Sequence, residues 1–227
     1  SSAVTPTRFV AQYAKRRFRV ALTDGMSSLL WLPLRKMIEK QAPGIEIHAV
    51  PYKADGEALL LNAEVDLVLD YYPGTSKQIR SEWMFDNHFV CVMNSNHQLK
   101  DKELTLTRYL EADQLLVSLS GDPQGIVDHK LAELGKSRRL AMTVNSFASA
   151  INLIKDTSLI STLPYPIVAP FVAANELIIK PTPIAIPPAR ISMAWHCRQD
   201  HDSGLSWLRD SFHQIVESKR ELLDTPI

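Results

Sequence analysis

Hydrophobic and polar positions in the first part of the chain alternate in a pattern typical of strands and helices that follow one another. Phe18–Leu22 alternates as a strand, and the apolar positions of Met26–Ala42 recur on one helical face. Ile45–Val50 alternates as a second strand and Gly56–Glu64 is short and helical. Val65–Leu69 is almost continuously apolar, as expected for a central strand covered on both faces. This order predicts a parallel, right-handed βαβαβ unit.

The same order recurs in the second half of the chain. Strands are predicted at Leu115–Ser118, Leu140–Val144 and Leu159–Leu163. Helices are predicted between them at Asp122–Leu134 and Ser146–Lys155. Two successive parallel units predict two lobes with a ligand cleft between them.

The apolar segments left over by these units connect the lobes. Phe85–Met93 and Arg190–His196 are predicted to be strands that cross between them, and Ser203–Leu223 a helix that covers the first lobe. The predicted fold class is α/β, with two Rossmann-like lobes joined by two crossing strands, as in periplasmic solute-binding proteins. The expected division is a remnant of a tag or linker at residues 1–16, lobe I at residues 17–90 and 193–227, and lobe II at residues 91–192.

Composition and charge exclude several classes of protein. Of 227 residues, 45% are hydrophobic and 22% charged, which excludes collagen-like and disordered chains. Lys plus Arg and Asp plus Glu are 25 each, so the chain as a whole has no net charge to attract nucleic acid or an acidic membrane. No apolar stretch approaches the roughly 18 residues of a membrane span. If the protein controls DNA, we expect another part of it to bind the DNA.

Two local features bear on compartment and on the start of the chain. Cys91 and Cys197 both lie in apolar, strand-like runs, which predicts buried thiols in a reducing compartment, the cytoplasm. Basic residues gather near the start without an acid among them, which predicts either a solvated arm or the stub of a linker. These residues are Arg8, Lys15, Arg16, Arg17 and Arg19.

Motifs for catalysis are absent. The sequence has no G-x-G-x-x-G, no P-loop, no G-x-S-x-G and no His-Glu-x-x-His, and its seven histidines do not fall at metal-ligand spacing. Asp24 and Asp70 both follow predicted parallel strands, so they could act as an acid and a base, or simply form turns and cap helices. We favour the second role and predict no catalytic residue, no metal and no cofactor.

Polar turns follow the predicted strands of both units. Because parallel strands end at one edge of a sheet, these turns converge where open α/β sheets bind ligands. Hydroxyl groups and helix amides suit a small polar or anionic ligand, and the aromatic and Met side chains suit an apolar body. The predicted ligand-binding residues are Thr23, Asp24, Met26, Ser27, Tyr71, Ser118, Ser146, Phe147, Pro164 and Trp195.

The two ends of the core carry a resemblance to a known family. Phe18–Asp24, Val65–Leu69, His97 and Trp195-His196 resemble the effector-binding domain of LysR-type transcriptional regulators. The closing run of His196, Asp202, Gly204, Trp207, Leu208 and Arg209 resembles the ending of the branch that contains nodulation and naphthalene/salicylate regulators. The resemblance covers about residues 17 to 220.

This resemblance implies a type 2 periplasmic-binding-protein-like fold and a small-molecule inducer in the interlobe cleft. It also implies a winged helix-turn-helix domain before residue 1 that carries the DNA binding, a homodimer that becomes a tetramer in the full-length protein, and RNA polymerase as a candidate partner. The chain departs from the branch at Val144–Phe147, where the branch often reads Val-Pro-His-Phe. The missing His puts in doubt a cationic group for a carboxylate inducer. A second departure, Asn96-His97-Gln98 in place of Asp-His-Pro, concerns a turn.

Three classes of function remain at this point. A ligand-sensing regulatory domain is favoured over a solute-binding protein that delivers to a transporter, and over an enzyme on the same scaffold. The helix at residues 27–41 has apolar residues on more than one stripe, since Trp31 and Leu32 lie off the face that must cover its own sheet. We therefore expect a homodimer in which this helix packs beside the partner's second lobe, near Asp122–Leu134. The predicted interface residues are Leu30, Trp31 and Leu34.

Overall fold

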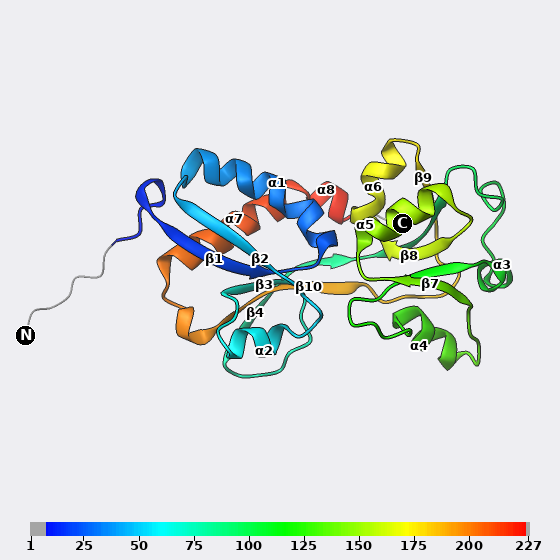
Figure 1. Cartoon of the computed structure of the whole chain (residues 1–227), viewed down its shortest axis with the longest axis horizontal. Coiled ribbons are helices and arrows are strands. Elements are labelled where there is room, and N and C mark those ends of the chain that lie inside the picture. Colours follow the sequence, from blue (N-terminus) through cyan, green and yellow to red (C-terminus); the bar gives the residue numbers. More distant parts are fainter. Residues whose placement is uncertain (1–7, 226–227) are drawn as a thin grey trace, which may run out of the picture. The chain divides into compact units, whose positions relative to one another are not determined.

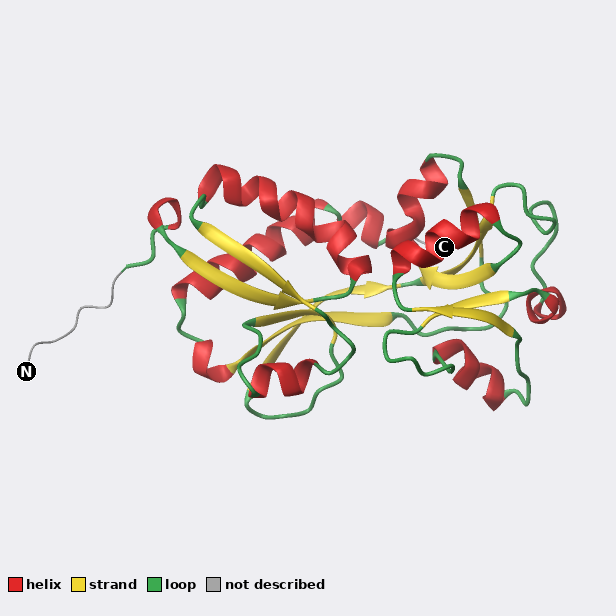
Figure 2. Ribbon diagram, in the orientation of Figure 1, coloured by secondary structure: helices red, strands yellow, loops and turns green. Residues whose placement is uncertain are grey.

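The computed structural model describes residues 8–225 and divides into two compact units. Each unit has its own sheet, covered by helices on both faces (Figure 2). Unit 1 consists of Ser1–Leu22, Leu30–Met84 and Ile191–Arg220, and unit 2 of Thr23–Leu29, Phe85–Arg190 and Glu221–Ile227. Residues 1–7 and 226–227 of these ranges lie outside the described part.

Five strands form the sheet of unit 1 in the order β2-β1-β3-β10-β4. Strand β1 pairs in parallel with both β2 and β3, and β10 runs antiparallel to β3. This parallel trio confirms the first predicted βαβαβ unit. The strands are β1 Arg16–Ala21, β2 Ile45–Val50, β3 Leu67–Tyr71, β4 Ile79–Asn87 and β10 Ala189–His196.

Helices α1 and α7 lie over one face of this sheet and the short helix α2 over the other (Figure 1). Helix α7 buries Leu205, Leu208, Phe212 and Ile215, whose spacing places them on one face. The helices that contain residues of unit 1 are η1 Ala11–Tyr13, α1 Asp24–Gln41, α2 Gly56–Leu61, η2 Cys197–Gln199, α7 Ser203–Ser218 and α8 Arg220–Leu223.

Helix α1 is divided between the two units. Its first turn, up to Leu29, belongs to unit 2, and the rest, from Leu30, belongs to unit 1. Pro33 lies inside the helix and has no N–H to donate to the carbonyl of Leu29 four residues earlier. The boundary between the units, between Leu29 and Leu30, therefore lies next to the carbonyl group that receives no helical hydrogen bond from Pro33.

The sheet of unit 2 has the order β7-β6-β8-β5-β9. Strand β6 is parallel to β7 and β8, which confirms the second predicted βαβαβ unit, and β5 runs antiparallel to β8 and β9. The strands are β5 Phe89–Asn94, β6 Gln114–Val117, β7 Leu140–Val144, β8 Ile160–Pro164 and β9 Leu177–Lys180.

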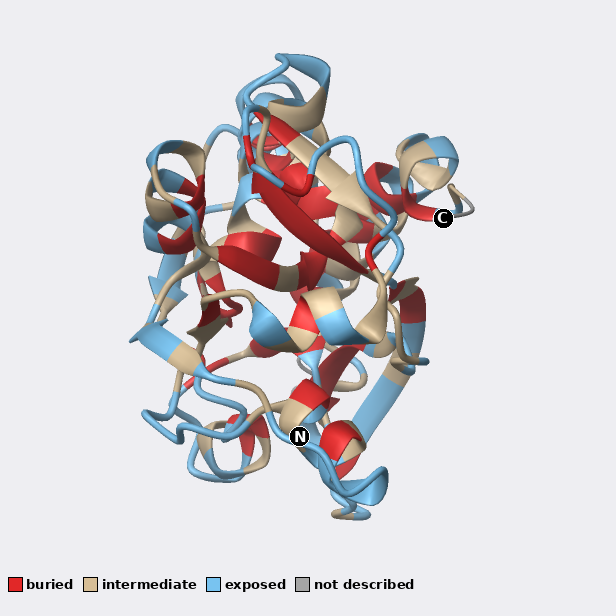
Figure 3. Ribbon diagram, turned by 90° about the vertical axis from the view of Figure 1, so that its right-hand side faces the viewer, coloured by how far each residue is buried: buried red, intermediate tan, exposed pale blue. Residues whose placement is uncertain are grey.

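Helices α5 and α6 lie over one face of the second sheet and α4 over the other (Figure 1). In β5, Cys91 and Met93 pack with Val127 and Leu131 of α4, while Val90 and Val92, on the other face of the strand, are also fully buried. Figure 3 shows the buried residues gathered in the strands and on the inner sides of the helices. No helix among residues 8–225 is long and apolar enough to cross a membrane. The helices are α3 Leu106–Glu111, α4 Ile126–Glu133, α5 Phe147–Asp156 and α6 Tyr165–Ala173.

Three predictions about elements are wrong. The segment Phe85–Met93 is not one strand, because the chain leaves the first sheet with β4 and enters the second with β5, with His88 between them. The last helix is interrupted at Lys219, whose N–H donates to the carbonyl of Val216, three residues back, in a tighter turn. Cys197 is only half-buried, because it lies in the 3-10 turn η2 rather than in a strand.

Three of the five basic residues near the start, which the sequence predicts to form a solvated arm or the stub of a linker, have acidic partners. The acids come from distant segments, which is why the local sequence does not show them. Of the predicted tag or linker remnant, residues 1–7 lie outside the described part, Ala11–Tyr13 form one turn and Arg16 begins β1. The ion pairs are Arg16–Asp202 at 2.8 Å, Arg17–Glu46 at 2.9 Å and Arg19–Asp66 at 3.5 Å.

Candidate functional site

The first turn of α1 meets the start of α5 within unit 2. The carboxylate of Asp24 accepts two backbone hydrogen bonds, from Phe147 N to Oδ1 at 3.0 Å and from Ala148 N to Oδ2 at 2.9 Å. These two amides have no acceptor inside their own helix, because the first N–H groups of any helix lack one. Asp24 thus joins two of the predicted turns, which lie 123 residues apart in the sequence.

The remaining amides at the start of α5 are also satisfied. Ser146 is the N-cap residue, and its Oγ accepts from Ser149 N at 3.1 Å. The amide of Ala150 donates to the carbonyl of Ser146 at 3.3 Å, which is the first bond of the helix itself. The first amides of α5 therefore all bond to oxygen atoms of the protein.

Hydroxyl groups in the first turn of α1 bond to that turn. Thr23 is buried, and its Oγ1 accepts from Met26 N at 3.3 Å, as an N-cap side chain does. The Ser27 hydroxyl donates to the carbonyl of Asp24 at 2.7 Å. Since a hydroxyl oxygen that donates can still accept, Ser27 keeps acceptor capacity for a ligand.

Gly25 allows the first turn of α1 to lie close to the second sheet's helices. A Cβ atom at this position would lie 2.6 Å from Ile167 Cδ1 and 2.9 Å from Phe147 Cδ2. Neither Gly25 nor Ile167 is among the predicted ligand-binding residues. Gly25 precedes the predicted helix at Met26–Ala42, so the hydrophobic pattern does not signal this close approach.

Two further predicted residues of unit 2 close turns. Ser118 follows β6 and is half-buried; its Oγ donates to the carbonyl of Asp122 at 2.7 Å, and its N–H donates to Val144 O at 2.7 Å. Pro164 ends β8, is buried and precedes the first residue of α6. Neither side chain has an ionisable group, so any contribution to binding would come from shape and from the Ser118 hydroxyl.

Unit 1 holds the other two predicted residues, in different surroundings. Tyr71 ends β3 and is 48% exposed, and its backbone carbonyl accepts a hydrogen bond from the Tyr52 hydroxyl. Trp195 is only 7% exposed, and its Nε1 donates to Asp200 Oδ1 at 3.0 Å. The guanidinium of Arg209 lies 3.9 Å from the centre of the Trp195 ring. Trp195 is therefore held on both its edge and its face by unit 1.

The arrangement around the acids does not form a metal or nucleophilic centre. Among residues 8–225, no group of three or more His, Cys, Asp and Glu side chains is placed to hold a metal ion. Both carboxylate oxygens of Asp24 accept backbone amides, and Asp70, which is buried in unit 1, accepts the amide of Tyr71 at 2.8 Å. Asp24 thus caps the start of α5, and Asp70 bonds to the backbone of its own strand.

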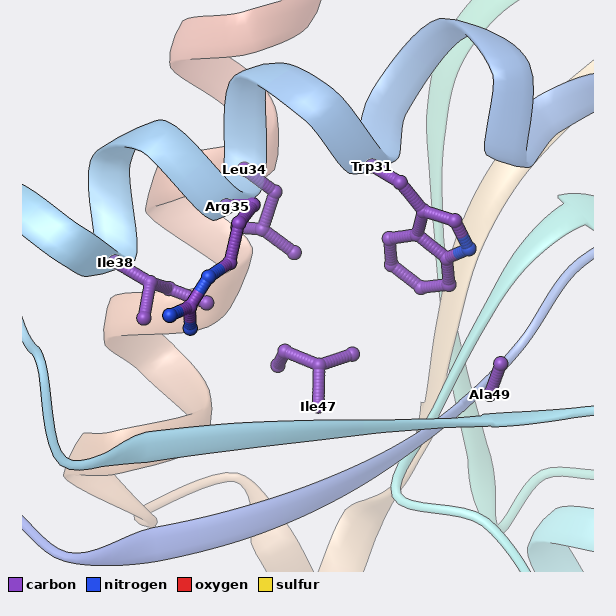
Figure 4. Close-up of a pocket in the computed structure, with 6 residues that line it drawn as sticks. All are labelled: Trp31, Leu34, Arg35, Ile38, Ile47 and Ala49. Atoms are coloured by element: carbon purple, nitrogen blue, oxygen red, sulfur yellow. The ribbon is translucent and has the colours of Figure 1, made fainter.

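A separate groove of about 230 Å³ lies in unit 1 between α1 and β2, the outermost strand of the sheet. Trp31, Leu34 and Ile38 descend from the helix, and Ile47 points up from the strand to meet them (Figure 4). The Trp31 ring also lies 6.5 Å from that of Phe212. Of the predicted interface residues, Leu30 is almost completely buried and does not line the groove, whereas Trp31 and Leu34 do. The other lining residues, Arg35, Ile38, Ile47 and Ala49, are not among the predicted interface residues.

Comparisons with known proteins identify what the chain is similar to. The family described as the LysR substrate binding domain matches residues 11–216. Nodulation protein D 2 of Bradyrhizobium diazoefficiens is 28% identical over 202 residues, which cover 88% of this chain and 61% of the relative. The HTH-type transcriptional activator NahR of Pseudomonas putida is 27% identical over 201 residues, which cover 86% of this chain and 66% of the relative. The chain thus spans less than two thirds of the length of these relatives.

Solved structures agree with the family match. The regulatory domain of MexT, a transcriptional activator in Pseudomonas aeruginosa, has a TM-score of 0.78 and 26% identity, and the alignment covers 89% of this chain and 98% of that one. The regulatory domain of MetR, a LysR family regulator from Neisseria meningitidis, has a TM-score of 0.70 and 19% identity, with 91% and 95% covered. At that identity the second likeness concerns the fold alone, which is the predicted type 2 periplasmic-binding-protein-like fold.

Proposed function

Because the chain belongs to the LysR substrate binding domain family, we propose that it is the ligand-sensing domain of a transcriptional regulator and that it binds a small-molecule inducer. The observation that carries this proposal is the family match across residues 11–216, which includes both α/β units. The polar turns at the ends of parallel strands support it, since this is where open α/β sheets bind ligands. On this proposal the domain acts by binding and not by catalysis.

We infer that the inducer contacts the turns that follow the strands. In unit 2 these are the first turn of α1, the loop after β6, the start of α5 and the end of β8. Phe147 would supply apolar surface there, and Thr23, Ser27 and Ser118 would supply hydroxyl groups. Met26 is only 1% exposed, so its side chain belongs to the core of this turn. The contact by Tyr71 of unit 1, and the position of the inducer between the lobes, stay predictions of the sequence analysis. Trp195 is also a weak member of the predicted set, because its ring is already held by Arg209 and its Nε1 by Asp200.

A screen of small molecules by thermal shift tests this function. A ligand that binds only the native domain raises its melting temperature by mass action. We expect at least one class of small polar or aromatic compounds to raise it in a dose-dependent way. A broad library from which no compound raises it, on a domain shown to be folded, would contradict the proposal.

The second part of the proposal is that two copies form a homodimer through the groove beside Trp31. Support comes from its position at the outer edge of a sheet, where both an apolar groove and unpaired strand groups are open to a partner. A two-fold axis would bury each groove once in the same interface and leave none exposed. The partner surface that we expect is the region around Asp122–Leu134 of the other copy.

For the intact protein we infer an arrangement that the relatives' names and lengths support. NahR is named an HTH-type transcriptional activator, and this chain matches 66% of its length. A helix-turn-helix domain outside this chain would bind DNA, and the full-length protein would act in the cytoplasm as a tetramer, with RNA polymerase as a candidate partner. A change in the angle between subunits on inducer binding would alter the spacing of the DNA-binding domains.

A further inference from the structure

We propose that Asp24 determines the charge of the ligand, so that the domain takes an uncharged molecule with a hydrogen-bond donor and rejects a carboxylate at the start of α5. This inference rests on the proposed function, because it assumes that the inducer reaches the first turn of α1. It adds the chemical class of the inducer and the residue that selects it.

The start of a helix attracts anions, because its amides point outward and the helix dipole is positive there. In α5, a helix of ten residues, this position is already filled. The Asp24 carboxylate accepts from Phe147 N and Ala148 N, and the Ser146 hydroxyl accepts from Ser149 N. A ligand carboxylate would find no unpaired amide at this point, and it would also meet the negative charge of Asp24.

The position of Asp24 is fixed by its surroundings. Ser27 N donates to Thr23 O at 2.9 Å and the Ser27 hydroxyl donates to Asp24 O, so the turn that carries Asp24 is closed on itself. The next residue, Gly25, has no room for a Cβ atom beside Ile167 and Phe147. The carboxylate is therefore a built part of this turn, and it occupies the two amides that a ligand carboxylate would need.

The same carboxylate can bind the opposite kind of group. Each carboxylate oxygen has two lone pairs, and each oxygen of Asp24 accepts one amide. The second lone pair of each oxygen is left for a ligand donor, such as a phenolic hydroxyl or an amide N–H. Ser27 Oγ, which donates to its own helix, offers a further acceptor. The chemistry of the turn thus favours a neutral donor.

Benzoate and benzamide form a matched pair of probes, because they share the ring and differ in charge. The test compares their affinities, by calorimetry or by thermal shift, for the wild-type domain, for Asp24→Ala and for Asp101→Ala. Asp101 is exposed in the same unit, so this control removes an equal charge without touching the turn. We expect Asp24→Ala to bind benzoate at least about tenfold more tightly than the wild type does, since two amides become free for an anion. Asp101→Ala should behave as the wild type, and benzamide should gain nothing from Asp24→Ala.

Three outcomes would overturn the inference. These are equal benzoate affinity in the wild type and Asp24→Ala, weaker benzoate binding by Asp24→Ala, and a gain for benzamide as large as the gain for benzoate. If circular dichroism shows that Asp24→Ala does not fold, Asp24→Asn replaces it. The Asn side chain keeps one acceptor for the turn and releases one amide, so the gain for benzoate should persist at a smaller size.

The library screen on the wild-type domain separates this inference from the proposed function. Carboxylate hits that shift the amide NMR signals of Phe147 and Ala148 would leave the function standing and refute the role of Asp24. A screen without any hit would count against the function, while the gain of benzoate binding in Asp24→Ala would still decide whether Asp24 fills the start of α5.

Discussion

Arg138 and Asp128 are joined inside unit 2 by two hydrogen bonds, Nε to Oδ1 at 2.9 Å and Nη2 to Oδ2 at 3.0 Å. The Arg138 side chain is 1% exposed. Its Nη1 donates to Gln114 Oε1, and Gln114 in turn donates to the carbonyl of Tyr109. This chain of bonds links α4, β6 and α3, and it satisfies a charge that would otherwise be buried without a partner.

Replacing Arg138 with Met should destabilise the domain by about 3 kcal/mol, because it leaves the carboxylate of Asp128 partly buried without its partner. The neighbouring Arg139 offers a matched control. It pairs with Asp113, and both side chains are largely exposed, at 73% and 45%. Arg139→Met should change the free energy of unfolding by less than about 1 kcal/mol. Urea unfolding of both variants checks this prediction. Equal losses of unfolding free energy would show that the buried network stabilises the domain no more than the exposed pair does.

The free energy of unfolding should decrease as the pH falls, because Asp128 and Asp202 lose their negative charge. Burial favours the neutral form of each, but hydrogen bonds from Arg138 to Asp128, and from Arg16 to Asp202, outweigh it and lower both pKa values below the ordinary value of 3.8. Because the folded-state pKa is lower than the unfolded one, this stabilisation is complete above the unfolded pKa of about 4 and is lost as the pH falls through the folded pKa.

The pH dependence of urea unfolding, measured on the wild type and on Asp128→Asn, checks this sign. The difference in unfolding free energy between the two proteins should be largest near neutral pH and should shrink below about pH 4. A difference that grows on acidification would contradict the assignment.

The two thiols should differ sharply in reactivity. Burial raises the pKa of Cys91 to about 12, and the side chain is completely buried in β5. Cys197 is half-buried in a 3-10 turn. With a thiol reagent near pH 8, we expect the native domain to react at one thiol and the urea-unfolded domain at two. Cys197→Ser should remove the native reaction, and persistent labelling of that variant would place Cys91 within reach of solvent.

The proposed homodimer predicts a mass about twice the 25.5 kDa of the chain in sedimentation equilibrium at micromolar concentration. Trp31→Glu should convert it to a monomer, because the charge would be buried in the apolar groove. Trp83, which is 45% exposed in β4 at the opposite edge of the same sheet, is the control, and Trp83→Glu should remain dimeric. A wild-type species at the monomer mass would refute the dimer.

The sequence predicts those elements whose hydrophobic period is strong. Strands Ile45–Val50 and Leu140–Val144 have the expected bounds, and both parallel units form as expected. Helix α6 was missed, because Pro166 and Pro170 interrupt its pattern, although Pro166 lies in the first turn, where proline is tolerated. Strand β9, Leu177–Lys180, was not predicted.

The contacts that build the candidate site are harder to predict, because they join distant segments. Asp24 was expected at the end of a strand, beside other polar turns, but nothing local indicates that its carboxylate binds amides 123 residues later in the sequence. The pair Arg16–Asp202 spans 186 residues and was likewise not foreseen. Side-chain direction is a second reason, since Trp195 lies on the expected strand but is held by Arg209.

Calorimetric titration of a compound found in the screen tests the central claim most directly, when it is applied to the wild-type domain and to Thr23→Val, Phe147→Ala and Thr107→Val. Thr107 is exposed in α3 of the same unit and serves as the control for Thr23. Loss of a hydrogen-bonding hydroxyl or of an aromatic contact should each weaken binding by about 1–2 kcal/mol, or roughly tenfold. We predict this loss for Thr23→Val and Phe147→Ala and an unchanged affinity for Thr107→Val. Unchanged affinity in all three folded variants would contradict the account.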